Sequence, residues 1–437
     1  MSIGMKKITQ NIGWLMFDQF FILFLQFIVG VKVANYYGAE LYGKYSYAMS
    51  LVGFSGIFFE ILNSRVIKKY YTEENYEKIV YNITFFKNSI AILLFIVPIF
   101  SKVVLKIDNT LFYLLIFMCL DNILSSTTFG IENFFEYKLE SRRIVISNNI
   151  VKVISYSLQY ICMSLNMGII IIPIVRCIGS FIRMCLLKYQ YKKYYQANKK
   201  IRNKLNIKLL LKMIDEGKML WISFVAFLIY TQIDKMMIKY YLGEKEIGVY
   251  SIGVALSSIF AILIGPIQNS MYPKMLELYK KNYKEYYSFY LKTNTIITYL
   301  YLVLAIVSIF VVRWLFKYVY SEEYNQAIMV YSILTVSVLV RANAIFQMGH
   351  MVIKNITKKS FYKTLTGLVM NTVLNIILIP KYGINGAAIA TSLTHFVTAI
   401  CMDYFILEYR EHFFIQVKSF NVFNVFIKIE RQRDEVV

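Results

Sequence analysis

Several ionisable residues stand inside long apolar stretches of this sequence, and six of them are candidates for a functional site. An ionisable group at membrane depth costs about 2.5–3.5 kcal/mol or more, so those that remain there face a cavity or a partner. Arg176 and Asp121 lie near the middle of their apolar stretches and are the strongest candidates. The six are three cations and three carboxylates: Lys152, Arg176, Arg341, Asp18, Asp121 and Asp234.

The cations suit an anionic ligand. The stretch from Ser141 to Ile214 contains no acidic residue, yet it holds Lys152 and Arg176. A water-filled vestibule of positive potential would accommodate them and would attract an anionic substrate such as a phosphate. Pairing with Asp18 or Asp121 from another helix explains them equally well. The three carboxylates could instead serve as proton or sodium sites for ion coupling or gating.

The composition indicates what kind of element must position these charges. Hydrophobic residues make up 58% of the 437 residues and charged residues 17%, with a mean hydropathy of +0.52. Soluble globular proteins have about 45–50% apolar and about 25% charged residues. The chain is therefore predicted to be an all-α integral membrane protein. Twelve segments reach the roughly 20 apolar residues that a spanning helix needs: 12–34, 45–62, 86–105, 110–131, 144–165, 168–187, 219–242, 247–271, 289–312, 325–346, 364–380 and 384–407.

The net charge of +22 follows the predicted topology. With the N-terminus inside, the loops assigned to the cytoplasm carry 31 Lys and Arg residues, and the opposite loops carry seven. Cytoplasmic loops of membrane proteins have this excess of basic residues. Both termini are therefore expected in the cytoplasm, and the basic excess gives no reason to expect a nucleic-acid partner.

A sequence repeat divides the spans into two sets of six. Residues 38–51 match residues 243–256 at an offset of 205, with both glycines and the Tyr-Ser pair in register. Six spans per half give the two copies the same orientation across the membrane, which is a parallel repeat. We expect an N-terminal six-helix bundle at 1–187, a basic cytoplasmic linker at 188–216, a C-terminal six-helix bundle at 217–407 and a cytoplasmic tail at 408–437. Anionic membrane lipids are expected partners of the linker.

The sequence lacks the motifs of several other chemistries. It has no G-x4-GK[ST] loop for a nucleotide. Its five cysteines all lie in apolar segments without metal-ligand spacing, and its three histidines form no motif with carboxylates. We therefore expect no metal, no cofactor and no catalytic residues, and we expect a transporter in place of an enzyme.

Three segments resemble bacterial oligosaccharide flippases, the polysaccharide biosynthesis proteins of the Wzx O-antigen type. They are the loop 35–48 (NYYGAELYGKYSYA), the stretch 233–250 that contains Ile-Asp-Lys and the second Gly-x4-Gly, and 371–391 (NTVLNIILIPKYGINGAAIAT). The likeness follows nearly the whole chain in order.

The resemblance implies the fold of the multidrug/oligosaccharidyl-lipid/polysaccharide (MOP) exporter superfamily, which is MATE-like, with two six-helix bundles around a central cavity. It also implies alternating access and a substrate: undecaprenyl-diphosphate-linked oligosaccharide, flipped across the bacterial cytoplasmic membrane for O-antigen or capsule assembly. A polysaccharide polymerase and a chain-length regulator would be partners of such a flippase. Lys152, Arg176 and Arg341 are then expected to bind the anionic head group.

Two other classes of protein remain open. A MATE-like ion-coupled small-molecule antiporter would have the same fold, but its cationic substrates would need a buried acid cluster. A membrane-bound polysaccharide polymerase or acyltransferase would normally carry a large outward loop or a catalytic His/Arg motif. The longest outward loop expected here is only about a dozen residues.

Overall fold

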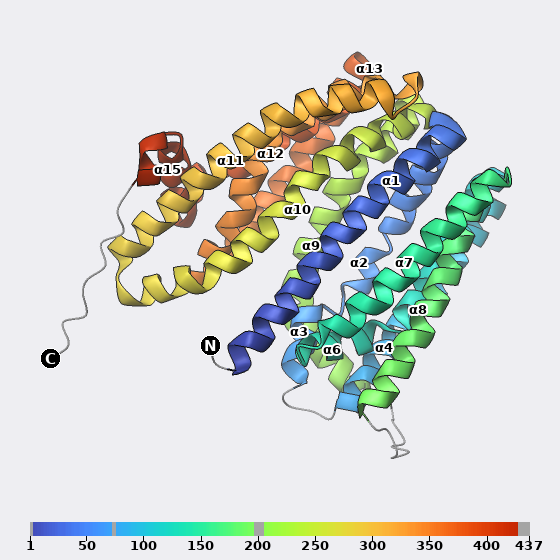
Figure 1. Cartoon of the computed structure of the whole chain (residues 1–437), viewed down its shortest axis with the longest axis horizontal. Helices are drawn as coiled ribbons and strands as arrows, with labels where there is room; N and C mark the ends of the chain where they lie inside the picture. The colour runs from blue at the N-terminus through green and yellow to red at the C-terminus, as the bar shows by residue number, and fades with distance from the viewer. Residues whose placement is uncertain (1–2, 72–75, 196–204, 427–437) are drawn as a thin grey trace. The chain divides into compact units, whose positions relative to one another are not determined.

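The computed structural model describes residues 3–71, 76–195 and 205–426, and every regular element in these ranges is helical (Figure 1). The chain divides into two compact units, Met1–Gln232 and Ile233–Val437, and the division falls within one long helix. Residues 196–204 of the predicted linker and 427–437 of the predicted tail lie outside the described residues. The domain boundaries given above stay predictions.

The helices follow one another with short connections. In the first unit they are α1 (Ile3–Gly53), α2 (Gly56–Phe59), α3 (Ser64–Tyr70), α4 (Tyr76–Val104), α5 (Asn109–Ser126), α6 (Phe129–Tyr137), α7 (Ser141–Ser164) and α8 (Ile171–Tyr195). Helix α9 (Ile207–Leu242) contributes to both units. The second unit holds α10 (Glu244–Lys281), α11 (Tyr283–Tyr318), α12 (Gln326–Ile353), α13 (Ser360–Phe396), α14 (Met402–Phe405) and α15 (Arg410–Ser419).

Short helical turns complete these elements. Four are 3-10 turns: η1 (Glu322–Tyr324), η2 (Thr357–Lys359), η4 (Leu407–Tyr409) and η5 (Val422–Phe426). The fifth, η3 (Val397–Cys401), is a π-helical turn between α13 and α14.

Seven helical segments of the described chain are long and apolar enough to cross a membrane. Two of the seven, Phe20–Tyr70 and Thr357–Phe405, each overlap two of the predicted spans. The chain is therefore a multi-pass, all-α membrane protein, as its composition predicted.

Glycines turn the backbone where the repeat predicted matching loops. Gly38 interrupts α1 with φ 73° and ψ 170°, and Gly243 precedes α10 with φ 97° and ψ −168°. Residues with a side chain rarely adopt a positive φ, so both turns require glycine. These two glycines are 205 residues apart and share one backbone conformation, so the repeat holds in structure at this point.

Helix α13 folds sharply at a third glycine. Gly383 has φ 59° and ψ −141°, three residues after Pro380. A Cβ atom built on Gly386 would lie 2.1 Å from the carbonyl oxygen of Leu378. The two arms of α13 thus approach each other at a distance that only glycine permits, and this fold brings the residues before and after the turn together.

We predict that Gly386→Ala destabilises the protein, because the new methyl group collides with backbone that cannot rotate away. Overpacking of this kind typically costs about 1–3 kcal/mol. The matched control is Gly265→Ala, since a Cβ atom there meets nothing within 4 Å among the described side chains. Thermal unfolding of the purified proteins in detergent should give a lower midpoint for Gly386→Ala alone. Equal midpoints would contradict the close approach.

Candidate functional site

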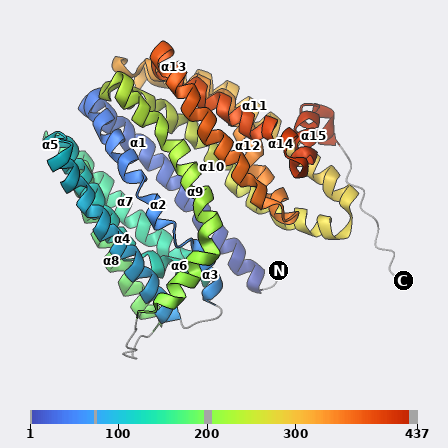
Figure 2. The same ribbon diagram turned by 180° about the vertical axis from the view of Figure 1, so that it is seen from behind.

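A cavity of about 500 Å³ lies inside the first unit. Its walls come from α1, α5, α7 and α8, which Figure 2 labels in the first unit. Among these helices, α1 packs on α7, α7 on α8, α8 on α5 and α5 on α1. Its volume falls within the roughly 300–1,000 Å³ of typical ligand sites. The polar side chains that line it are those of Gln26, Tyr42, Tyr45, Asp121, Ser125, Asn148, Lys152, Ser155, Tyr156, Gln159, Arg176, Ser180 and Arg183.

Arg176 is held in the cavity wall by an ion pair. Its Nη2 atom lies 3.1 Å from Oδ2 of Asp121, and Nη1 lies 3.5 Å from the hydroxyl of Tyr45. Ser180 donates a hydrogen bond to the other oxygen of Asp121. The Arg176 side chain nevertheless stays 40% exposed, whereas that of Asp121 is 11% exposed. The guanidinium has five N–H donors, so a positioned Arg176 can still donate to a ligand.

Arg183 forms a second polar cluster in the same unit. It donates to Oδ1 of Asn148 over 2.6 Å and pairs with Glu132 over 2.7 Å. Thr128 lies 3.3 Å from Nη1 of Arg183 and donates to Oε1 of Glu132. The cluster orients a further cation whose side chain reaches the cavity wall.

The close approach of α7 and α8 brings these cations together. A Cβ atom at Gly179 would lie 2.3 Å from the hydroxyl oxygen of Ser155 on α7. Small residues at such crossings let membrane helices pack tightly without a hydrophobic driving force. Gly179 follows Arg176 by one turn, so the crossing fixes the position of Arg176 relative to Lys152, which lines the cavity from α7.

Among the described residues that line this cavity, three are cationic and one is acidic. Arg176 pairs with Asp121 in the cavity wall, as one of the two predicted alternatives has it. That these cations attract an anionic substrate stays a prediction. Of two further predicted residues outside this list, only the side chain of Arg341 can be placed. Arg341 is a half-buried residue of α12 in the second unit and does not line this cavity, and the side chain of Asp18 lies outside the described residues.

Asp234 occupies a separate site in the second unit. Its Oδ2 atom accepts hydrogen bonds from Tyr250 over 2.7 Å and from Thr391 over 2.6 Å, and Oδ1 accepts from Asn375 over 2.7 Å. Asn371 lies in contact with both Asn375 and Thr391. A nearly buried carboxylate is thus surrounded by neutral donors from α10 and both arms of α13. These donors belong to the segments that carried the family resemblance.

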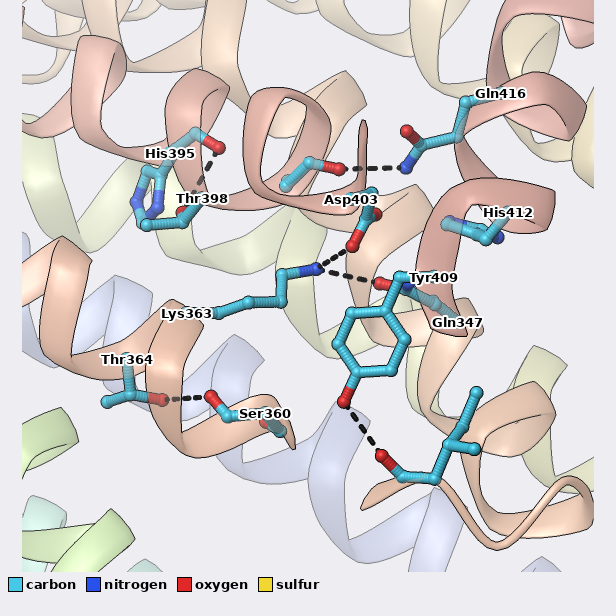
Figure 3. Close-up of polar contacts among 12 residues, drawn as sticks. Gln347, Ser360, Lys363, Thr364, His395, Thr398, Asp403, Tyr409, His412 and Gln416 are labelled. Carbon is cyan, nitrogen blue, oxygen red and sulfur yellow. Dashed lines mark hydrogen bonds and ion pairs between the residues drawn. The ribbon is translucent and has the colours of Figure 1, made fainter. Parts of the chain in front are cut away.

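Lys363 and Asp403 form a buried ion pair that the sequence analysis did not predict (Figure 3). Nζ of Lys363 lies 2.7 Å from Oδ1 of Asp403 and 2.9 Å from Oε1 of Gln347. Asp403 and Gln347 are inaccessible, and Lys363 is buried. Lys363 directly precedes the predicted span 364–380, so the predicted spans alone place it in a loop.

Comparison with known proteins identifies the family. A family model described as "polysaccharide biosynthesis protein" matches residues 8–279, which is more than half of the chain. The chain belongs to the polysaccharide biosynthesis protein family. The capsular polysaccharide biosynthesis protein CapF of Staphylococcus aureus is 24% identical over 404 residues, covering 91% of this chain and 98% of CapF.

An archaeal relative matches over a shorter region. The uncharacterized membrane protein MJ1068 of Methanocaldococcus jannaschii is 25% identical over 285 residues, or 62% of this chain. This match spans half the length of the archaeal protein.

Solved structures show the same fold. The lipid II flippase MurJ in an inward closed conformation superposes with a TM-score of 0.69 at 16% identity, over 93% of this chain and 91% of MurJ. An inward-facing multidrug resistance MATE family transporter of the MOP superfamily superposes with a TM-score of 0.68 at 12% identity, over 91% and 96%. The predicted fold class and family are confirmed.

We predict that removing one partner of the Lys363–Asp403 pair destabilises the protein strongly. An uncompensated buried charge costs about 3–5 kcal/mol, whereas replacing both partners by apolar residues is often neutral. Lys363→Met and Asp403→Leu should each lower the thermal unfolding midpoint, and the double variant should recover most of the loss. The exposed pair Lys274–Glu277 provides the control, since either single change there should have little effect. Additive losses in the Lys363–Asp403 double variant would contradict the pairing.

Proposed function

We propose that the chain is a flippase for undecaprenyl-diphosphate-linked oligosaccharide repeat units. It moves them by alternating access across the bacterial cytoplasmic membrane, with both termini in the cytoplasm, for O-antigen, capsule or other surface polysaccharide assembly. The observation that carries the proposal is the exposed, positioned guanidinium of Arg176 in a cavity whose charged lining is mainly cationic. Family membership and the flippase named among the similar structures support the same class of substrate.

The cavity lining fits both parts of such a head group. Arginine donates paired hydrogen bonds that match a phosphate, and Lys152 adds a second positive charge nearby. The rings of Tyr42 and Tyr156 provide apolar faces with a polar edge, and Gln159 provides an amide donor and acceptor. These groups are suited to sugar rings beside a diphosphate. Arg341, in the second unit, stays a weaker candidate for the same role.

Among the three carboxylates, Asp234 is the best candidate for ion coupling or gating. Asp121 already has Arg176 as a charged partner, and the hydrogen-bond donors described around Asp234 are neutral. A proton or a sodium ion bound at Asp234 would alter its hydrogen bonds to both arms of α13. Binding there would thus change the packing of α10 against α13.

A MATE-like antiporter is the second candidate, favoured by the fold shared with a multidrug transporter. The lining of the cavity argues against cationic drugs as its ligands, because three lining cations would repel them. A surface polysaccharide polymerase and a chain-length regulator are the proposed functional partners of the flippase.

The sharpest test is Arg176→Ala in cells that depend on this protein for surface polysaccharide. Charge-assisted hydrogen bonds contribute about 1.5–3 kcal/mol, so we expect roughly a tenfold or greater loss of polymer. Repeat units should accumulate on the cytoplasmic leaflet while the protein level in the membrane stays normal. Arg176→Lys should be intermediate, since it keeps the charge but not the paired donors.

The control is Arg142→Ala, an exposed arginine of α7 that does not line the cavity. Normal polymer in the Arg176→Ala strain would refute the assigned role. Normal polymer together with altered drug sensitivity in a deletion strain would favour the antiporter.

For the coupling role, we predict that Asp234→Asn uncouples transport from the ion gradient. Removing the negative charge abolishes cation binding while the side chain keeps its shape. Proteoliposomes with an imposed proton or sodium gradient should show faster transport for the parent protein and no acceleration for the variant. Asp215→Asn, at a carboxylate that is 74% exposed, is the control. Acceleration of both variants to the same extent would exclude Asp234 as the coupling residue.

A further inference from the structure

The chain after the last span forms a folded segment with two different faces. We call α15 and η5 together the C-terminal segment (residues 410–426). Its inward face buries His412, Ile415, Gln416 and Ser419. Its outward face exposes large apolar side chains, with Phe423 at 74% and Phe426 at 76%. The other exposed apolar residues on this face are Phe414, Val417, Phe420 and Val422.

Specific polar contacts hold the inward face against the second unit. The ring nitrogen Nδ1 of His412 lies 2.7 Å from the hydroxyl of Tyr290, and Gln416 donates to the carbonyl of Ala399 over 3.1 Å. Figure 3 shows His412 and Gln416 on this face, close to the Lys363–Asp403 pair. Burial holds the pKa of His412 well below its usual value, so the ring is neutral at physiological pH. The contacts of His412 and Gln416 fix the position of the C-terminal segment on the second unit.

The end of α15 lies at the edge of the apolar layer. Helix α11 has no charged residue between Lys292 and Arg313, an interval of 20 residues, or about 30 Å at 1.5 Å per residue. This length matches the hydrocarbon core of a bilayer. Tyr299, which donates to the carbonyl of Phe420 over 2.6 Å, stands seven residues after Lys292. Its backbone is therefore about 10 Å inside the charge-free interval.

The outward face of the segment continues the outer face of α11. Ile296, Leu300 and Val303 are exposed on α11 at helical spacing, next to Tyr299. These side chains lie in the charge-free interval of a helix long and apolar enough to span a membrane, so we expect lipid to cover them. Ser419 also contacts Thr298, with 3.1 Å between the two hydroxyl oxygens. The exposed phenylalanines that follow Ser419 therefore lie close to the start of the exposed apolar face of α11.

We propose that the C-terminal segment is a membrane-surface anchor, whose outward phenylalanines enter the lipid leaflet at the membrane face where α11 begins. Interfacial helices bury their apolar face about 5–10 Å into the boundary between headgroups and acyl chains, which agrees with the depth of Tyr299. Lys418 is exposed on the same helix and can extend its charge toward the headgroups. The segment would thereby hold the beginning of α11 and the end of α14 at the bilayer surface.

The test uses the full-length protein in bilayers that contain lipids brominated near the carboxyl end of the acyl chains, which quench tryptophan at that depth. Phe423→Trp and Phe426→Trp are made separately, and the emission of the parent protein is subtracted. The matched control is Lys281→Trp, at the end of α10, where the lysine side chain is 69% exposed. The anchor predicts that brominated lipid removes more than half of the added emission at positions 423 and 426 and little of it at 281.

Two results would overturn the anchor. Added emission at 423 and 426 that is red-shifted and quenched no more than at 281 would place the face in water. Added emission that is blue-shifted but insensitive to brominated lipid would show that protein covers the face. Two probe positions keep the test decisive if one variant is poorly folded.

Discussion

The free-energy cost of an ionisable group in an apolar layer governs the polar architecture of this protein. Helices that cross a membrane gain little from burying further apolar surface against one another, so close contacts and polar partners fix their positions. Arg176 meets Asp121, Lys363 meets Asp403, and Asp234 meets three neutral donors. Each of these contacts joins two different helices.

The two ion pairs differ in whether a ligand can reach their charged atoms. The Lys363–Asp403 pair is closed, and the carboxylate is inaccessible, so it can hold α13 to α14 but cannot reach a ligand. The Arg176–Asp121 pair is open on one side, since the guanidinium stays accessible in the cavity. The same chemistry therefore closes a contact in one unit, and in the other it leaves a guanidinium accessible for the proposed anionic ligand.

The sequence repeat carries different chemistry in its two copies. Tyr45 and Tyr250 are equivalent residues, 205 positions apart. Tyr45 lies beside the cation Arg176, whereas Tyr250 donates to the carboxylate of Asp234. The position equivalent to Asp234 in the first copy is Val29, which lines the cavity. One ancestral turn thus supports a cationic cavity in one unit and a carboxylate site in the other.

Hydropathy and charge bias predict the membrane class and the helical spans, because these depend on local composition. Pairing of Arg176 with Asp121 is one of the two alternatives that the sequence leaves open. The Lys363–Asp403 pair does not follow from the sequence, because it depends on how α13 turns. The turn at Gly383 explains two of the contacts: Asn375 and Thr391 each lie eight residues from it, and Lys363 and Asp403 each lie twenty. A hairpin centred on this glycine brings such equidistant residues together. The equal spacing of these residues is present in the sequence. The position of the turn between them is seen only in the structure, from the positive φ of Gly383.

The central claim is that the cavity of the first unit binds the diphosphate-linked head group during its passage across the membrane. The most direct measurement is transbilayer movement of a labelled polyprenyl-diphosphate oligosaccharide in proteoliposomes that contain the purified protein. The account predicts movement with the parent protein, little movement with Arg176→Ala, and competition by inorganic diphosphate. Movement that is equally fast in both proteins and insensitive to diphosphate would contradict it.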